Sequence, residues 1–183
     1  MYGLDAQLTQ MINLAAGHHP LLDPVMIMAT AVGVPILVAL VAVQWWRNDD
    51  RQMVRHALVS CGFAFLLGLG MNQLVLLFVH RLRPYEIGVT HLLVAPSTDW
   101  SLPSDHATAT MAIAASFLLH RMPRTGALFL AASLVVMFSR VYVGIHFAGD
   151  VVAGAVTGVL AALLVWKLYR PGTGLDRLIT GIL

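Results

Sequence analysis

Two histidines and one aspartate have the residue types that phosphoryl chemistry needs. His146 precedes Asp150 by four residues. On a helix such a pair faces the same way, so the carboxylate can hold the imidazole in one tautomer and stabilise its cation. This spacing makes His146 a candidate nucleophile toward phosphorus, and His106, from another segment, a candidate general acid for the leaving oxygen.

Arginine and hydroxyl side chains near these residues suit a phosphate group. Arg83 and Arg140 carry planar, permanently charged forks that match phosphate oxygens, and Ser104 adds a hydroxyl donor. Pro103 before Ser104 is typical of a helix start, whose free amides point toward a bound anion. The hydroxyl of Ser104 can serve as helix cap, as phosphate ligand, or as both.

Other polar residues at the ends of apolar segments have simpler interpretations. Arg81 can bind phosphate or extend its charge to lipid headgroups, and the sequence leaves both open. A lone histidine at such an end is usually interfacial. That interpretation is applied to His18, His19, His56, His91 and His120.

The composition places the candidate site in a membrane protein. Of 183 residues, 58% are hydrophobic and 11% are charged, whereas soluble domains average about 25% charged residues. The net charge is only +2, with Lys167 as the single lysine, which argues against a nucleic-acid partner. Cys61 is the only cysteine, so it forms neither a disulfide framework nor a cysteine-based zinc site.

Periodicity predicts an all-α fold, a polytopic bundle of about five transmembrane helices. Apolar segments cover residues 25–46, 54–79, 105–120, 125–143 and 148–169, and about 20 residues cross a bilayer core. We expect one membrane-embedded domain over 1–183, with an outer loop at 84–103 and a cytoplasmic tail at 171–183. Pro35 should kink the first span, and Gly154 and Gly158 permit close helix contact in the last.

The N-terminal segment, residues 1–24, lacks the basic start of a secretory signal, so we expect it in the mature protein. Apolar residues within 2–17 follow helical spacing and predict an amphipathic helix. The sequence leaves two positions open for this helix, in the membrane interface or packed on the bundle.

Positive charge predicts the orientation. Three links that alternate onto one side hold most of the cations, and that side should be the cytoplasm. These residues are Arg47, Arg51, Arg55, Arg121, Arg124, Lys167, Arg170 and Arg177. The N-terminus and the candidate site are then outside the plasma membrane and the C-terminus is inside. The location at one depth of Arg83, His106 and His146 is itself a functional signal, since ionisable groups at span ends inside a bundle are costly.

Three motifs resemble those of the type 2 phosphatidic acid phosphatase family, which also includes vanadium haloperoxidases. Ser139-Arg140, five residues, His146, three residues and Asp150 is similar to its third signature. Pro103-Ser104-Asp105-His106 looks like its second, Pro-Ser-Gly-His, and Arg83-Pro84 like the end of its first. The Asp105 variant resembles the bacterial undecaprenyl-diphosphate phosphatase branch. The first signature departs, because Leu76 stands where the family has lysine, and Arg81 or His80 could replace it.

The resemblance implies a mechanism without metal or other cofactor. His146 would attack the terminal phosphorus to form a phosphohistidine, oriented by Asp150. His106 would protonate the leaving group and then activate water, while Arg83, Arg140 and Ser104 hold the phosphate oxygens. The expected substrate is a membrane lipid, with undecaprenyl diphosphate at the outer face of the bacterial plasma membrane favoured, an activity that supports cell-wall synthesis and bacitracin resistance.

Several alternatives remain at this point. The same fold suits phosphatidylglycerol phosphate, phosphatidic acid or a lipid A phosphate as substrate. A lipid transporter or binding protein is a different class, but it would place charges at the bilayer midplane rather than at span ends. A vanadium-type peroxidase does not fit five apolar spans. The sequence does not determine the oligomeric state or whether loop 84–103 gates the site.

Overall fold

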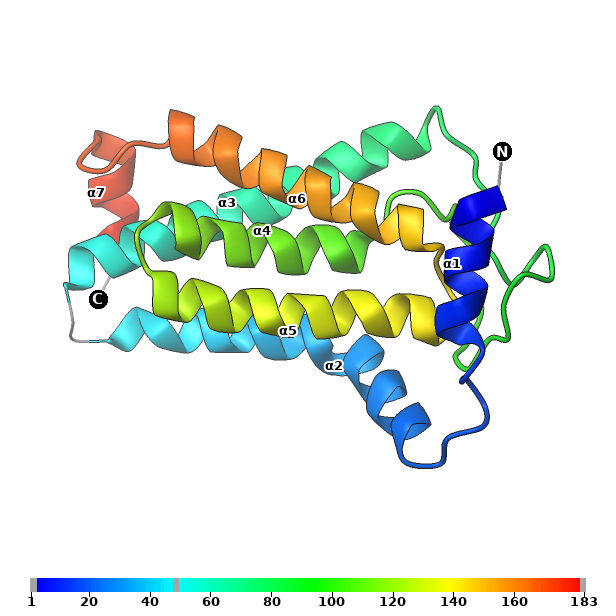
Figure 1. Cartoon of the computed structure of the whole chain (residues 1–183). Coiled ribbons are helices and arrows are strands. Elements are labelled where there is room, and N and C mark those ends of the chain that lie inside the picture. Colours follow the sequence, from blue (N-terminus) through cyan, green and yellow to red (C-terminus); the bar gives the residue numbers. More distant parts are fainter. Residues whose placement is uncertain (1–2, 48–49, 182–183) are drawn as a thin grey trace.

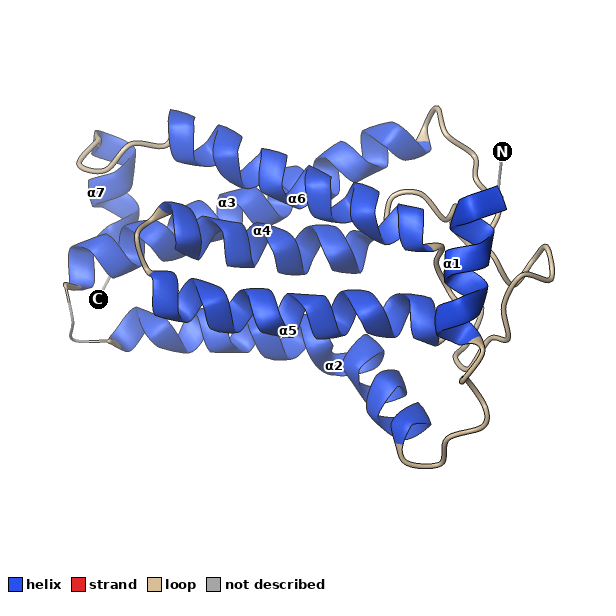
Figure 2. Ribbon diagram, in the orientation of Figure 1, coloured by secondary structure: helices blue, strands red, loops and turns tan. Residues whose placement is uncertain are grey.

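The computed structural model describes residues 3–47 and 50–181. Residues 1–2, 48–49 and 182–183, which belong to the predicted N-terminal segment, first link and tail, lie outside that range. Within it every regular element is a helix (Figures 1 and 2), which confirms the all-α prediction. The elements are α1 Gly3–Asn13, α2 Leu22–Val43, the 3₁₀ turn η1 Gln44–Trp46, α3 Arg51–Leu76, α4 Asp105–Leu119, α5 Pro123–Tyr142, α6 Ala148–Leu168 and α7 Gly174–Thr180.

Four helices have the length and apolar composition to cross a membrane. They are Leu22–Trp46, Arg51–Leu76, Pro123–Tyr142 and Ala148–Leu168. The fifth predicted span, α4, has 15 residues and is about 22 Å long, less than a hydrocarbon core of about 30 Å. α4 runs through the middle of the bundle, in contact with α3, α5 and α6 (Figure 1). Most of its residues are buried, so it forms the core around which the four longer helices pack.

Close contact between α4 and α6 fixes the position of both N-termini. A Cβ atom on Gly154 would lie 2.4 Å from the carbonyl oxygen of Ser104, and one on Gly158 would lie 2.4 Å from that of Thr108. The Thr108 hydroxyl donates to the Gly154 carbonyl at 2.9 Å. The predicted small-residue step therefore brings the first turn of α4 against the first turns of α6.

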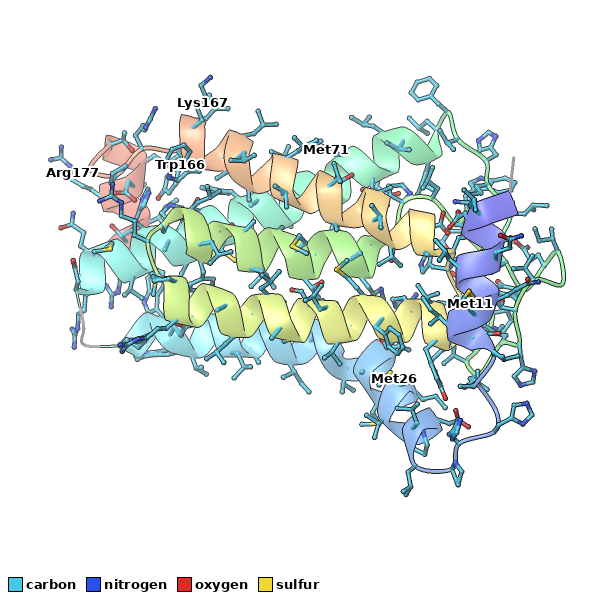
Figure 3. All side chains as sticks on the ribbon, in the orientation of Figure 1. Met11, Met26, Met71, Trp166, Lys167 and Arg177 are labelled. Atoms are coloured by element: carbon cyan, nitrogen blue, oxygen red, sulfur yellow. The ribbon has the colours of Figure 1, made fainter. Side chains whose placement is uncertain are left out.

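α1 lies across one end of the bundle (Figure 1), here called the α1 end. Its polar side faces inward: the Asn13 amide donates to the Tyr142 carbonyl at 2.7 Å and the His91 carbonyl at 2.9 Å. Its large apolar side chains point outward, with Leu4 79% and Met11 73% exposed (Figure 3). α1 thus packs on the bundle through its polar side and turns its apolar face away from the protein.

α2 changes direction along its length, and its N-terminal part diverges from α5 (Figure 1). Pro35 lies inside the helix and supplies no amide to the helical ladder, which explains the predicted kink. Beyond it, the Tyr142 hydroxyl donates to Asp23 at 2.6 Å and ties the start of α2 to the end of α5. The diverging part of α2 thus stays attached near the α1 end.

The opposite end, here called the α7 end, is held by a buried polar cluster. Asp176 accepts hydrogen bonds from His56 at 2.8 Å and from Tyr169 at 2.7 Å. These bonds dock α7 against α3. His56 was interpreted from the sequence as interfacial, but the residue is only 5% exposed. The sequence did not show this, because the aspartate that pairs with it lies 120 residues further on.

Candidate active site

His146 lies in a tight turn between α5 and α6 rather than on the helix. The backbone amides of Ile145 and His146 both donate to the Arg140 carbonyl, each at 3.3 Å. Gly144 has φ +82°, and a Cβ there would be 2.3 Å from the His91 carbonyl oxygen. Only glycine fits this turn, which returns the chain into the bundle and buries the His146 side chain.

Hydrogen bonding fixes the tautomer of His146. Its Nδ1 lies 2.9 Å from the Ser101 carbonyl oxygen, which can only accept, so Nδ1 carries the proton. The Asp150 carboxylate is at 3.6 Å, close enough for charge stabilisation but too far for a hydrogen bond. The lone pair is therefore on Nε2, 3.3 Å from the Arg83 guanidinium. Ser101 was not predicted.

The surroundings also keep the imidazole neutral. Burial lowers the pKa of His146 to about 4; Asp150 opposes this effect, and the charges of Arg140 and Arg83 add to it. An uncharged imidazole with its lone pair beside a guanidinium is the form that can attack phosphorus.

Asp150 is fully buried and held by three donors. It accepts from the Arg81 guanidinium at 2.6 Å, the Ser101 hydroxyl at 2.5 Å and the backbone amide of Phe147 at 2.9 Å. The last bond closes the first turn of α6, because Asp150 reaches back to the residue before the helix. Asp150 thus fixes both the helix start and the turn that carries His146.

Arg83 is the cation nearest to His146. Its side chain is almost fully buried and donates to the Ile145 carbonyl and to the Asp99 carboxylate, at 3.0 and 2.6 Å. Burial raises the pKa of Asp99, but hydrogen bonds from Ser97 and Arg83 outweigh it, so the net shift is downward. A charged Asp99 holds the guanidinium in place from the loop side.

Two buried polar atoms of the predicted phosphate ligands have no partner among the described residues. They are the Nε of Arg140, whose Nη1 donates to Thr30 at 2.9 Å, and the hydroxyl of Ser104. Ser104 precedes the first residue of α4, as predicted, yet makes no capping hydrogen bond. Buried donors are normally satisfied, so these two suit an anion, and capping does not explain Ser104.

His106 belongs to the same cluster. Its ring lies near the backbone of Thr30 and close enough to Arg140, His146 and Arg83 to interact with their charges. The structure thus gathers the predicted residues from four segments of the chain at the α1 end. Among the described residues, no group of three or more His, Cys, Asp or Glu side chains could hold a metal ion.

The comparisons with known proteins decide the family. Residues 25–173 match the PAP2 superfamily. The chain belongs to this superfamily. It is 28% identical to the undecaprenyl-diphosphatase BcrC of Bacillus subtilis over 171 residues, 92% of this chain and 87% of the relative.

Two solved structures share the fold. Aquifex aeolicus LpxE superposes with a TM-score of 0.74 at 23% identity, over 90% of this chain and 96% of that one. The phosphatidylglycerolphosphate phosphatase of Bacillus subtilis superposes with a TM-score of 0.68 at 23% identity, over 90% and 83% of the two chains. At this identity the likeness describes the fold alone. The family and its relatives make the chain a membrane lipid phosphatase.

The two departures from the PAP2 signatures have structural counterparts. Asp105, which replaces glycine, accepts a hydrogen bond from the fully buried Asn72 at 2.7 Å; Asn72 also donates to Thr108 at 2.9 Å. Leu76 ends α3, one turn beyond Asn72. Arg81 forms ion pairs with Asp150 and with Asp5 of α1. Asn72 and Asp5 were missed because neither belongs to a motif.

Proposed function

We propose that this phosphatase hydrolyses undecaprenyl diphosphate to undecaprenyl phosphate through a phosphohistidine on His146. The carrying observation is the unprotonated Nε2, 3.3 Å from the Arg83 guanidinium, at the end of the bundle where Ser104 and Arg140 present unpartnered buried donors. The substrate rests on the relative named undecaprenyl-diphosphatase, which is similar over nearly the whole chain, and on the Asp105 variant.

In the first step Nε2 of His146 bonds to the terminal phosphorus as the bond to the bridging oxygen breaks. Arg83, Arg140 and Ser104 hold the other oxygens of the phosphorus, and His106 gives a proton to the undecaprenyl phosphate that leaves. Asp150 stabilises the positive charge that develops on the imidazole. Positioning and charge supply most of the acceleration, as is usual in phosphoryl transfer.

In the second step water attacks the phosphohistidine. His106, now neutral, takes a proton from the water while the phosphorus–nitrogen bond breaks. Inorganic phosphate leaves, and His146 regains its lone pair on Nε2 with the proton still on Nδ1. Both protons are then accounted for, and no metal is assigned a role in either step.

The test is phosphate release from a panel of lipids in detergent, by the wild type and His146→Ala. The panel contains undecaprenyl diphosphate, phosphatidylglycerol phosphate, phosphatidic acid and a lipid A phosphate. We expect the polyprenyl substrate to be fastest, His146→Ala to lose at least about 10³-fold in kcat, and the wild type to yield an acid-labile phosphoenzyme after an alkaline quench.

The matched control is His18→Ala, which removes an exposed histidine near the same end and should leave kcat unchanged. Equal or higher rates on the glycerophospholipids would overturn the polyprenyl assignment. Residual activity of His146→Ala close to that of the wild type would overturn the mechanism, whichever lipid is preferred.

A further inference from the structure

A line of alternating charges connects α1 to the catalytic carboxylate. Arg81 donates through one nitrogen to Asp150 at 2.6 Å and through the other to Asp5 at 2.5 Å. Asp150 in turn lies 3.6 Å from Nδ1 of His146. The Arg81 side chain is 16% exposed, Asp5 25% and Asp150 not at all, so water screens this line only weakly.

The position of Asp5 is fixed by the start of α6. Its second carboxylate oxygen accepts the Gly149 amide at 2.8 Å, while the hydroxyl of Thr9, one turn later on α1, accepts the Ala148 amide at 3.0 Å. These amides belong to the first turn of α6, which has no helical partners for them. A Cβ on Gly149 would lie 2.7 Å from the Asp5 carboxylate, so a larger residue there would displace that carboxylate.

Arg81 is fixed as well. Its guanidinium carbon lies 4.0 Å from the centre of the Phe147 ring, next to the turn that carries His146. With its carbon over an aromatic ring and its nitrogens bonded to two carboxylates, the guanidinium is held at Asp150.

The sum of the charges gives Asp5 a function. Attack by His146 on phosphorus makes the imidazole more positive, and the charge of Asp150 stabilises that change. A single Arg81–Asp150 pair would be neutral and would cancel much of this effect. With Asp5 included, the three side chains Asp5, Arg81 and Asp150 carry a net charge of −1, which stabilises the imidazole as it becomes positive.

We propose that Asp5 is a positioning residue of the phosphatase reaction, which acts through Arg81 to keep the full charge of Asp150 available to His146. The inference rests on the proposed histidine mechanism. In this proposal α1 contributes to catalysis, and Arg81 binds the Asp150 carboxylate rather than the phosphate of the substrate.

The test compares three variants with the wild type on the same lipid substrate in detergent. Asp5→Asn keeps the shape but removes the charge, and we expect kcat to fall about tenfold with KM within about twofold. Asp5→Glu restores the charge and should recover at least half of the lost kcat. Thr9→Val removes the hydrogen bonds of the Thr9 hydroxyl with the Ala148 amide and the Asp5 carbonyl, but leaves the Asp5 carboxylate in place, and should keep kcat within about threefold of the wild type.

Two results would overturn the inference. One is wild-type kcat in Asp5→Asn, and the other is an equal loss of kcat in Asp5→Asn and Thr9→Val, which would mean that Asp5 only docks α1. His146→Ala is assayed alongside: if it is inactive while Asp5→Asn is unaffected, only this inference fails. If His146→Ala is active, the proposed mechanism fails first.

Discussion

The contacts of His146 differ in how well they could be predicted from the sequence. The pairing with Asp150 could be predicted from the four-residue spacing, and the two do lie together. The group that sets the tautomer is the backbone carbonyl of Ser101. Every residue has such a carbonyl, so no pattern of residue types could have identified it. The same limit applies to Asp5, whose contact with Arg81 joins residues 76 positions apart.

The protonation of His146 should differ from that of an ordinary histidine. Because burial lowers its pKa to about 4, while the unfolded chain has about 6.5, the imidazole should stay neutral at pH 6. The folded state then binds fewer protons than the unfolded one between these values, so stability falls as the pH drops from about 6.5 toward 4.

The measurement is an NMR titration of ¹⁵N-histidine-labelled protein in detergent, with the signal of His146 assigned by its loss in His146→Ala. We expect one neutral tautomer, with the proton on Nδ1, down to about pH 5. Protonation with a midpoint at or above pH 6.5 would contradict the account of a buried, neutral nucleophile.

At the scale of elements, the helix pair α4 and α6 does most to assemble the site. The apolar segments predicted both helices to within two residues of their observed ends, because hydrophobic runs and the Pro103 start signal are local features. The sequence could not tell that α4 is the buried centre. Its alanine-rich face suits a tightly packed helix, and its 15 residues fall short of a membrane crossing.

The α4–α6 contact can be tested with one methyl group. Gly154→Ala would place a Cβ 2.4 Å from the Ser104 carbonyl, which forces the first turn of α4 away from α6. We expect a loss of about 1–3 kcal/mol in stability and at least about tenfold in kcat, since Ser104 and His106 shift with that turn. Thermal unfolding in detergent and the lipid phosphatase assay measure the two effects.

The matched control is Gly62→Ala on α3, where an added Cβ meets no atom within 4 Å. There the substitution should leave activity unchanged and raise stability by up to about 1 kcal/mol, through the better helix propensity of alanine. Equal behaviour of the two variants would show that helix propensity, not contact with Ser104, governs position 154.

For the whole molecule, the alternation of cations along the chain becomes a separation in space. The eight predicted cytoplasmic cations lie where α3 and α5 begin, where α6 ends, and in the segments next to these points, all at the α7 end. Figure 3 shows two of them, Lys167 and Arg177, far from Met11 on α1. The other three cations, Arg81, Arg83 and Arg140, are at the α1 end, committed to the site. The sequence predicted this separation, but not which face of α1 packs inward, because that depends on polar partners distant in the chain.

The orientation in the membrane is the last prediction, and it follows from that separation. Most cations gather at the α7 end, so we expect this end in the cytoplasm and the α1 end, with the site, outside. Cys61 is buried, so an introduced cysteine is the main reactive thiol. In intact cells His91→Cys, in the loop at the α1 end, should react with a membrane-impermeant maleimide, whereas Arg124→Cys, in the first turn of α5, should react only after permeabilisation. The reverse labelling pattern would place the site inside the cell, where it could act only on lipid phosphates of the inner leaflet.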